Sequence, residues 1–447
     1  MLKFINKLFS PVAQYGGLPK SVYILFIARI INRMGGFVHM FLTLFLSSKL
    51  GMNEAEIGFY MLLLGIGGMC GPMVGGWLAD HLGRKKVYIA AQGLAALLLI
   101  PCGFMGTSIY IVWVLIAFNF LGSMVRPVSS AMLTDLTPPE RRKDAFSLLY
   151  LGINFGVAIG PMLAGFLFKD YLQWIFWGDA LTTLIALALI TYYIPETKPT
   201  EDALKASKAQ GTGERAEEGS FMEVLIKRPL LLAFAGIGFF GAFVYAQHSF
   251  TIPLQLESLF RDEAATSFGY LMSFNAIVVL LFTSIVMRIT RHIKPIYNML
   301  IAYLFYLFGF GILTFADQYS QLSIVNNLDS SSEILQHVLQ LGLFYISFFI
   351  WTMGEILATT NSGVYIANHS PISHRGRFNA IINIIMGAGF TIGPAITGLV
   401  LMSIDFTQFW LIIGAISGVT AFLAYLLGRY EESEKTTTEL QYESSSK

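Results

Sequence analysis

Charge is scarce in this sequence of 447 residues. Only 13% of the residues are Asp, Glu, Lys or Arg, whereas 55% are hydrophobic. Soluble domains usually contain about 25% charged residues, so this composition indicates an integral membrane protein. The formal net charge is +1, which provides no basic excess for the phosphates of nucleic acid. We therefore expect a lipid bilayer around the chain and no nucleic-acid partner.

Cysteine is also rare, and recognisable catalytic motifs are missing. Cys70 and Cys102 both lie in apolar runs, which excludes a disulfide framework and a thiolate metal site. The sequence has no His/Cys/carboxylate cluster with metal-ligand spacing and no phosphate-binding Gly-Lys-Ser/Thr loop. We expect no metal, no cofactor and no enzymatic activity. The N-terminal segment lacks a small-residue cleavage site, so we expect it to be retained.

Long apolar runs dominate what remains. About 20 mostly apolar residues span a bilayer as a helix, and these runs do not alternate in polarity as barrel strands would. The sequence therefore predicts an all-α integral membrane protein with twelve transmembrane helices, at residues 22–47, 56–79, 86–106, 109–133, 145–168, 173–194, 230–256, 266–288, 296–316, 338–367, 379–402 and 407–428.

Basic residues are divided unequally between alternate loops. Of the 29 Lys and Arg residues, 23 fall in one set of loops and termini, and only Lys49, Lys169 and Arg261 fall in the other. Cytoplasmic loops carry the excess of Lys and Arg. We therefore expect a multi-pass protein of the cell membrane with both termini in the cytoplasm.

A polar stretch divides the chain into two six-helix bundles. Residues 196–228 are rich in Lys, Glu, Ala and Gly, a composition that buries little apolar surface. We expect this stretch to be a cytoplasmic linker between bundles at 1–195 and 229–430. The tail at 431–447 is predicted to be disordered for the same reason.

The two bundles are related by an internal repeat. A shift of 233 positions superimposes identical residues at six places, and such parallel repeats are typical of transporters with a substrate site between the halves. The matched pairs are Pro138 and Pro371, Arg142 and Arg375, Gly156 and Gly389, Gly160 and Gly393, Pro161 and Pro394, and Gly165 and Gly398.

Three motifs resemble those of the major facilitator superfamily of secondary transporters. The sequence GWLADHLGRKK at 76–86 resembles the family's loop motif, with His81 replacing a basic residue. The sequence RPVSSA at 126–131 resembles its membrane arginine motif, although Pro127 and Ser130 depart from the drug-antiporter form. A glycine ladder in the fifth run resembles its antiporter signature, at Gly152, Gly156, Gly160, Pro161 and Gly165.

The fifth run also resembles the proton-coupled peptide transporters. Tyr150, Asn154 and Gly156 fit that branch's F-Y-x-x-I-N-x-G segment. The first run reads Arg-Ile-Ile-Asn-Arg at 29–33, where that branch carries an E-x-x-E-R segment with two carboxylates. The resemblance to this branch is therefore confined to the fifth run.

The glycine ladder and the loop charges each allow two interpretations. Glycines four residues apart share one helix face and permit close packing, and the family resemblance implies that the same seam limits leak. Charges at the ends of the second, fourth and eleventh runs are either topology signals or a cytoplasmic latch between the halves. The latch candidates are Asp80, Arg84, Asp135, Arg375 and Arg377.

Ionisable residues deep in the bilayer are costly and indicate function. Arg33 and Arg126 lie in the N-terminal half, and Glu355 is the only acidic residue deep in the C-terminal half. Glu355 is predicted to be the proton-coupling carboxylate, facing Arg33 or Arg126 across a central cavity; the alternative is a structural ion pair. Asp179 is predicted to be an interfacial hydrogen-bond partner nearer the outer surface.

Polar and aromatic residues on the same helix faces complete the predicted substrate cavity. They are His39, Tyr150, Asn154, Tyr245, His248, Trp351, Asn379 and Asn383. A lone intramembrane histidine is alternatively only hydrogen-bonded.

Together with the family resemblance, these residues predict proton-coupled efflux of a small, partly apolar organic solute, as in multidrug or metabolite antiport, by a monomer. The alternatives are a proton-coupled peptide or nutrient symporter, and a non-transporting receptor or scaffold.

Overall fold

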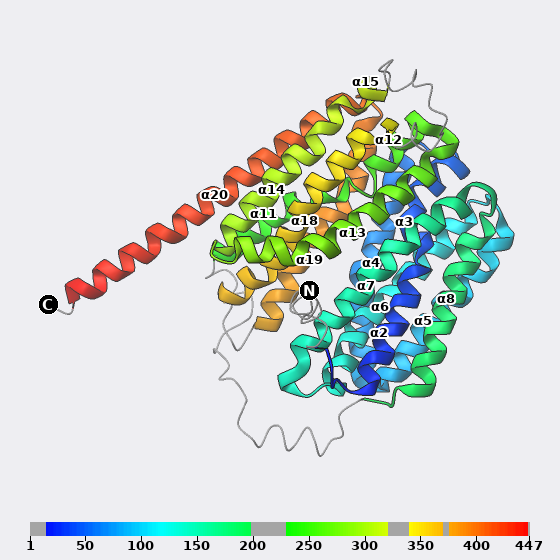
Figure 1. Cartoon of the computed structure of the whole chain (residues 1–447), viewed down its shortest axis with the longest axis horizontal. Helices are drawn as coiled ribbons and strands as arrows, with labels where there is room; N and C mark the ends of the chain where they lie inside the picture. The colour runs from blue at the N-terminus through cyan, green and yellow to red at the C-terminus, as the bar shows by residue number, and fades with distance from the viewer. Residues whose placement is uncertain (1–14, 198–228, 321–338, 370–374, 446–447) are drawn as a thin grey trace, which may run out of the picture. The chain divides into compact units, whose positions relative to one another are not determined.

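The structure is a computed structural model that describes residues 15–197, 229–320, 339–369 and 375–445. Every regular element in these ranges is helical, and none is a strand. Figure 1 shows the helices as long rods. The N-terminal elements are α2 (Lys20–Met34), α3 (Phe37–Leu44), η1 (Phe45–Lys49), α4 (Glu54–Leu82), α5 (Arg84–Met105), α6 (Tyr110–Leu136), η2 (Pro139–Arg141), α7 (Arg142–Asp170) and α8 (Gln173–Tyr193).

The C-terminal elements follow the same helical pattern. They are α11 (Pro229–Ala246), α12 (Thr251–Phe260), η3 (Arg261–Glu263), α13 (Ala264–Thr290), α14 (Pro295–Gly311), η4 (Ile312–Phe315), α15 (Ala316–Ser320), α18 (Gly342–His369), α19 (Arg375–Leu401) and α20 (Phe406–Ser445).

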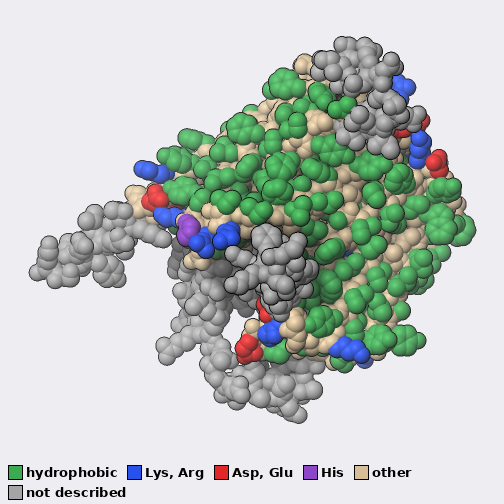
Figure 2. Space-filling view, viewed as in Figure 1, with side chains coloured by type: hydrophobic (Ala, Val, Ile, Leu, Met, Phe, Trp, Pro, Cys, Tyr) green, Lys and Arg blue, Asp and Glu red, His purple; other side chains and the backbone are tan. Residues whose placement is uncertain are grey.

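The predicted membrane-spanning segments agree with these helices. Eleven helical runs in the described residues are long and apolar enough to cross a membrane. The longest, Pro229–Thr290, contains two predicted segments, 230–256 and 266–288. All twelve predictions therefore have a counterpart, and the all-α, multi-pass membrane fold is confirmed. Hydrophobic side chains cover most of the face seen in Figure 2, as a lipid-facing surface requires.

The first predicted helix, 22–47, is interrupted rather than continuous. α2 ends at Met34 and α3 begins at Phe37, with Gly35 and Gly36 between them. A Cβ atom on Gly35 would overlap the side chain of Thr182 on α8. Two glycines in succession let the chain leave the helix while its backbone stays pressed against α8. The spanning run predicted at 22–47 is present as Lys20–Lys49, and the break within it is an addition that hydropathy does not register.

The seventh predicted helix, 230–256, is interrupted in the same way. α11 ends at Ala246 and α12 begins at Thr251. Gln247, which is fully buried, bridges the break: its amide nitrogen donates to the carbonyl of Phe243 (2.9 Å) and its amide oxygen accepts from the Thr251 hydroxyl (2.7 Å). The same oxygen accepts a hydrogen bond from Thr397 on α19 (3.2 Å). A polar side chain therefore satisfies groups that the interrupted helix leaves open.

The residues cluster into two compact units. Unit 1 comprises Met1–Met52, Tyr60–Ala209 and Leu256–Leu280, and unit 2 comprises Asn53–Phe59, Gln210–Gln255 and Leu281–Lys447. These bounds differ from the predicted bundles by the exchange of two short segments. Nearly all of the predicted linker lies outside the described residues.

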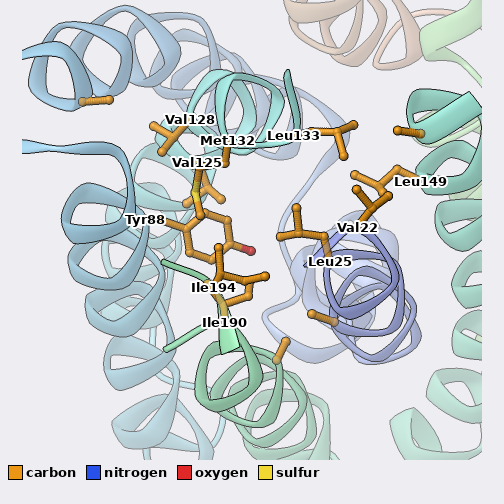
Figure 3. Packing of buried hydrophobic residues seen from close by; sticks show 14 of the residues in the cluster. Val22, Leu25, Tyr88, Val125, Val128, Met132, Leu133, Leu149, Ile190 and Ile194 are labelled. Carbon is orange, nitrogen blue, oxygen red and sulfur yellow. The ribbon is translucent and has the colours of Figure 1, made fainter. Parts of the chain in front are cut away.

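The core of unit 1 is a cluster of buried apolar side chains from α2, α5, α6, α7 and α8. Figure 3 shows Leu25, Tyr88, Val128 and Ile190 among the side chains that point toward one another. Tyr88 and Val125 belong to this cluster and also line a cavity described below. The cluster therefore forms part of the cavity wall.

α20 continues to Ser445, into the tail at 431–447 that the sequence predicts to be disordered. Glu431 accepts a hydrogen bond from Tyr365, and Glu432 forms an ion pair with Lys294 (2.8 Å). The hydrogen bond that Lys294 donates to Glu432 raises the pKa of the Lys294 ammonium group. Extending an existing helix requires no new nucleation, so polar residues can continue α20.

Candidate functional site

Unit 1 contains a cavity of about 190 Å³ beside the break between α2 and α3. Side chains of α2, α3, α5, α6 and α8 line it. We call it the arginine cavity, because its charged lining consists of three arginines facing one carboxylate, with a histidine beside them: Arg29, Arg33, Arg126, Asp179 and His39. The structure thus brings Arg33, Arg126 and His39 together, three of the residues predicted to meet substrate.

The three arginines differ in their contacts. Arg29 donates to the hydroxyl of Ser129 on α6 (2.8 Å). The Nε of Arg33 is buried and has no hydrogen-bond partner. Arg126 is exposed to the cavity, and its side chain makes no hydrogen bond or ion pair with any described residue. Two guanidinium groups therefore retain donors that the described part of the chain does not use.

Asp179 lies in the wall of this cavity, 4% exposed, where the sequence predicted an interfacial partner. Its Oδ2 accepts a hydrogen bond from the backbone nitrogen of Val38, in the first turn of α3 (3.4 Å). One turn further along α8, Thr183 accepts a hydrogen bond from Asn32 of α2 (3.0 Å). α8 thus contacts the chain on both sides of the break. The carboxylate of Asp179 lies at the N-terminus of α3, where the positive end of the helix dipole stabilises a negative charge.

Unit 2 places a carboxylate next to its own helix break. Glu355, near the middle of α18, accepts a hydrogen bond from the hydroxyl of Tyr245 in the last turn of α11 (2.8 Å). The ring of Tyr245 lies 4.4 Å from that of His248 and 5.9 Å from that of Trp351. Four residues predicted for the site therefore meet at one place.

Aromatic rings fill the space around this carboxylate. The ring centroid of Tyr245 lies 6.2 Å from that of Phe390 and 6.0 Å from that of Tyr306. We call Tyr245, His248, Tyr306, Trp351 and Phe390 the aromatic cluster. Trp351 is fully buried and stacks on Phe310, whose ring in turn stacks on Trp410 (both 5.8 Å). Sequence reasoning did not identify Tyr306 and Phe390, because nothing along the chain shows which aromatic residues of separate helices meet.

Other predicted cavity residues lie elsewhere. Tyr150 and Asn154 do not line the arginine cavity, and the Asn154 amide donates to the carbonyl of Tyr150, one turn earlier on α7 (2.9 Å). Asn383 is exposed on α19. Asn379 also lies on α19, but its side chain is outside the described part of the chain.

The glycine ladder of α7 faces α2. Cβ atoms on Gly156 and Gly160 would lie 2.9 Å from the carbonyl oxygen of Ile30 and 2.7 Å from that of Met34. Gly152 faces Phe26, and Gly165, beyond Pro161, meets the backbone of Ala265. In unit 2, Gly389 and Gly398 of α19 make equivalent close approaches to the backbone of Phe239 and Glu54, while a Cβ atom on Gly393 would lie 3.2 Å from that of Ala246. Both seams bring two helix backbones closer than a side chain allows.

Within unit 1 the loop charges form a local network. Arg84 forms an ion pair with Asp135, which joins α5 to α6 within unit 1. Asp80 is exposed, and no ion pair of Asp80 occurs among the described side chains. Glu196 accepts hydrogen bonds from the backbone nitrogens of Arg84 (2.8 Å) and Lys85 (3.2 Å), and so caps α5. The side chains of Arg375 and Arg377 are not described.

A second cavity in unit 1, of about 530 Å³, gathers the three basic residues that the loop analysis set apart from the rest. Lys49, Lys169 and Arg261 all line it. Acidic side chains alternate with them, and Lys169 pairs with Glu263 (3.9 Å). These charges therefore offset one another locally. Elsewhere in the described residues, no three His, Cys, Asp or Glu side chains come together as metal ligands.

The chain matches one family model over most of its length. The model for the Major Facilitator Superfamily matches residues 25–328 and 334–444. A Na⁺, Li⁺, K⁺/H⁺ antiporter of Planococcus maritimus is 24% identical over 80% of this chain and 84% of its own length. The uncharacterised MFS-type transporter YqjV of Bacillus subtilis is 22% identical over 92% of this chain and 94% of its own.

Solved structures share the fold. A POT family transporter in complex with a thioalcohol-conjugated peptide has a TM-score of 0.72 at 13% identity, covering 93% of this chain and 99% of that chain. The nucleoside transporter NupG has a TM-score of 0.70 at 16% identity, covering 91% of this chain and 100% of that chain. At these identities the likeness concerns architecture alone.

Proposed function

The chain belongs to the Major Facilitator Superfamily and is a membrane transporter; we propose that it exports a small organic solute in exchange for protons, by alternating access. The observation that carries the proposal is the position of Glu355 in unit 2. This carboxylate lies near the middle of α18, beside the break that ends α11, and is hydrogen-bonded to Tyr245.

A carboxylate at this depth suits proton transfer. Its desolvation depends on whether water reaches it, so the protonation of Glu355 depends on which side of the membrane has access. Interrupted helices in the corresponding positions of two repeats mark substrate and ion sites in transporters. Here the breaks follow Met34 and Ala246, and each has an acidic side chain beside it, Asp179 in unit 1 and Glu355 in unit 2.

Exchange is favoured over co-transport by two features. The first helix has arginines where the peptide transporters carry a pair of carboxylates, so the protonatable groups of that branch are missing. The curated relative named above as a cation/proton antiporter supports exchange as the direction of coupling. We further propose that the protein lies in the cell membrane with both termini in the cytoplasm, and that it works as a monomer.

Reconstituted vesicles test this function. The purified protein is inserted into liposomes that contain a pH-sensitive dye, and an outward gradient of an organic probe is imposed. The probes are benzenesulfonate, benzenesulfonamide and benzyltrimethylammonium. They are similar in size and are anionic, neutral and cationic, respectively, throughout the pH range of the assay. Exchange predicts that the outward flow of at least one probe moves protons inward. Co-movement of protons with the probe contradicts exchange and favours the symporter.

The Glu355→Gln variant tests whether Glu355 is the residue that carries the exchanged proton. Glutamine keeps the hydrogen bond from Tyr245 but carries no titratable proton, so proton movement should be lost while downhill exchange of labelled probe continues. Glu140→Gln, at an exposed position on η2, is the matched control. Proton movement by Glu355→Gln at the unmodified rate would exclude Glu355 as the carrier.

A further inference from the structure

We infer that the arginine cavity binds the negatively charged group of a small organic anion, and that Arg33 and Arg126 hold it. This inference rests on the proposed transport function, because it names the chemical class of the solute. The cavity has an excess of positive charge, donors without partners among the described residues, and a wall that is apolar in part.

The charges lining the cavity do not cancel. Three guanidinium groups, those of Arg29, Arg33 and Arg126, face the single carboxylate of Asp179. Arginine stays protonated at every physiological pH. Each buried charge is expensive in a membrane unless an opposite charge compensates it. The cavity therefore has an excess of positive charge that a bound anion would neutralise, whereas a cationic solute would be repelled.

The donors of two arginines are available to a ligand. Among the described side chains Asp179 forms no ion pair with Arg33, and its Oδ2 accepts a hydrogen bond from the backbone nitrogen of Val38 (3.4 Å). The Nε of Arg33 is buried without an acceptor, and the side chain of Arg126 has no hydrogen-bond partner in the described residues. A buried donor without a partner is destabilising, and a ligand that supplies the acceptor removes that cost. Planar guanidinium groups match the oxygens of carboxylate, sulfonate and phosphate by paired hydrogen bonds.

The size and wall of the cavity limit the rest of the ligand. A volume of about 190 Å³ is several times the roughly 30 Å³ share of a water molecule. Met40, Phe118 and Val125 line the same space as the arginines. A charged head against the arginines and a compact apolar body against these three side chains fit this arrangement, which describes an aromatic or aliphatic acid of small size.

Asp179 competes with such a ligand. Its carboxylate is the one negative charge already in the lining, and it is fixed by α3 rather than by an arginine. The negative charge of Asp179 repels a bound anion and lowers its affinity. Asparagine at this position would remove the charge and still accept the hydrogen bond from Val38.

Equilibrium binding to the full-length protein in detergent tests the inference without any gradient. The three fixed-charge probes are titrated separately, and the dissociation constant and the melting temperature are measured. Benzenesulfonate should bind and raise the melting temperature. Benzenesulfonamide, which has the same ring and no charge, and benzyltrimethylammonium should bind at least about tenfold more weakly.

Single substitutions locate the site. Arg33→Gln and Arg126→Gln should each weaken benzenesulfonate binding by about tenfold or more, and Arg33→Lys should restore part of it, because lysine keeps the charge but not the planar fork. Asp179→Asn should strengthen binding several-fold. Arg142→Gln, at an exposed position at the start of α7, is the matched control and should leave binding unchanged.

Three results would overturn the inference: no binding of benzenesulfonate, equal binding of the neutral or the cationic probe, and unchanged binding by monodisperse Arg33→Gln and Arg126→Gln proteins. The outcome is separate from that of the vesicle experiment. Binding of the anion without proton exchange would retain the anion site and reject the proposed function. Proton exchange driven only by the neutral or the cationic probe would retain the proposed function and reject the anion site.

Discussion

The two units build comparable frameworks and use them differently. Each interrupts its first helix, and each packs a glycine-lined helix against it, α7 on α2 and α19 on α11. Unit 1 leaves an open cavity beside the break, with guanidinium groups in its wall. Unit 2 surrounds Glu355 with aromatic rings, among them the fully buried Trp351. A duplicated scaffold thus supports two different chemistries, because the side chains beside the two breaks differ.

The breaks themselves show how the difference arises. Gly35 and Gly36 leave no side chains at the first break, so polar groups of neighbouring helices reach it and space remains. At the second break, Gln247 provides the hydrogen bonds that the interrupted backbone needs. With those bonds made internally, aromatic rings can pack around the break without exposing its backbone to an unfavourable apolar setting, although the Nε1 of Trp351 itself is buried without a partner among the described residues. An open cavity and a filled cluster follow from these two local solutions.

The largest expected effect concerns the shared framework. Gly156→Leu in unit 1 and Gly389→Leu in unit 2 should both prevent folding, because a Cβ atom would lie 2.9 Å from the Ile30 carbonyl oxygen in one case and 2.9 Å from the Phe239 carbonyl carbon in the other. Losses above about 5 kcal/mol are expected when helix backbones are forced apart. Size-exclusion chromatography of the detergent extract measures the yield of folded protein.

Gly387→Leu is the control for this pair. It lies on α19, two residues from Gly389, and a Cβ atom there would meet nothing within 4 Å. Its yield should match that of the unmodified protein. Folded Gly156→Leu protein at normal yield would show that only unit 2 depends on a close seam, and the two frameworks would not be equivalent.

The next effect separates the filled site from the open one. Trp351→Ala should lower the free energy of unfolding by about 3–5 kcal/mol, because it empties a fully packed position. Phe118→Ala should cost only about 1 kcal/mol, since Phe118 is half-buried and already faces a cavity. Thermal unfolding in detergent compares the two variants. Similar losses in both would mean that the arginine cavity is packed as tightly as the aromatic cluster.

A smaller effect is expected from the hydrogen bond to Glu355. Tyr245→Phe removes only the hydroxyl that donates to the carboxylate (2.8 Å) and keeps the ring in the aromatic cluster. Loss of one such bond should destabilise the protein by about 1–2 kcal/mol and slow proton exchange in vesicles. Tyr425→Phe, at a position 41% exposed on α20, is the matched control. Unchanged exchange by Tyr245→Phe would indicate that Glu355 works without this donor.

Much of the framework was predictable from the chain, since hydropathy and glycine spacing are local signals. The helix bounds agree to within a few residues, and the ladder beginning at Gly152 was recognised as a packing face. The partner of Asp179 could not be predicted, because position along α8 does not show that the break after Met34 brings the backbone of Val38 to it. The partners of Trp351 were likewise out of reach, since the rings around it include Tyr245 of α11, His248 of the break after α11 and Phe310 of α14.

The smallest expected effect concerns the charges at the loop between α4 and α5, and it asks whether a latch acts on unit 1. Asp135 is already engaged by Arg84 inside the unit, so the carboxylate available for a contact elsewhere is the exposed Asp80. Asp80→Asn should therefore slow transport by about fivefold, the effect of roughly 1 kcal/mol on a conformational equilibrium, without a change in melting temperature. Lys86→Gln, an exposed charge on α5, should transport normally. Equal transport rates for Asp80→Asn and Lys86→Gln would leave the loop charges as topology signals alone, because a solvated lysine and a latch carboxylate cannot have the same effect on the cycle.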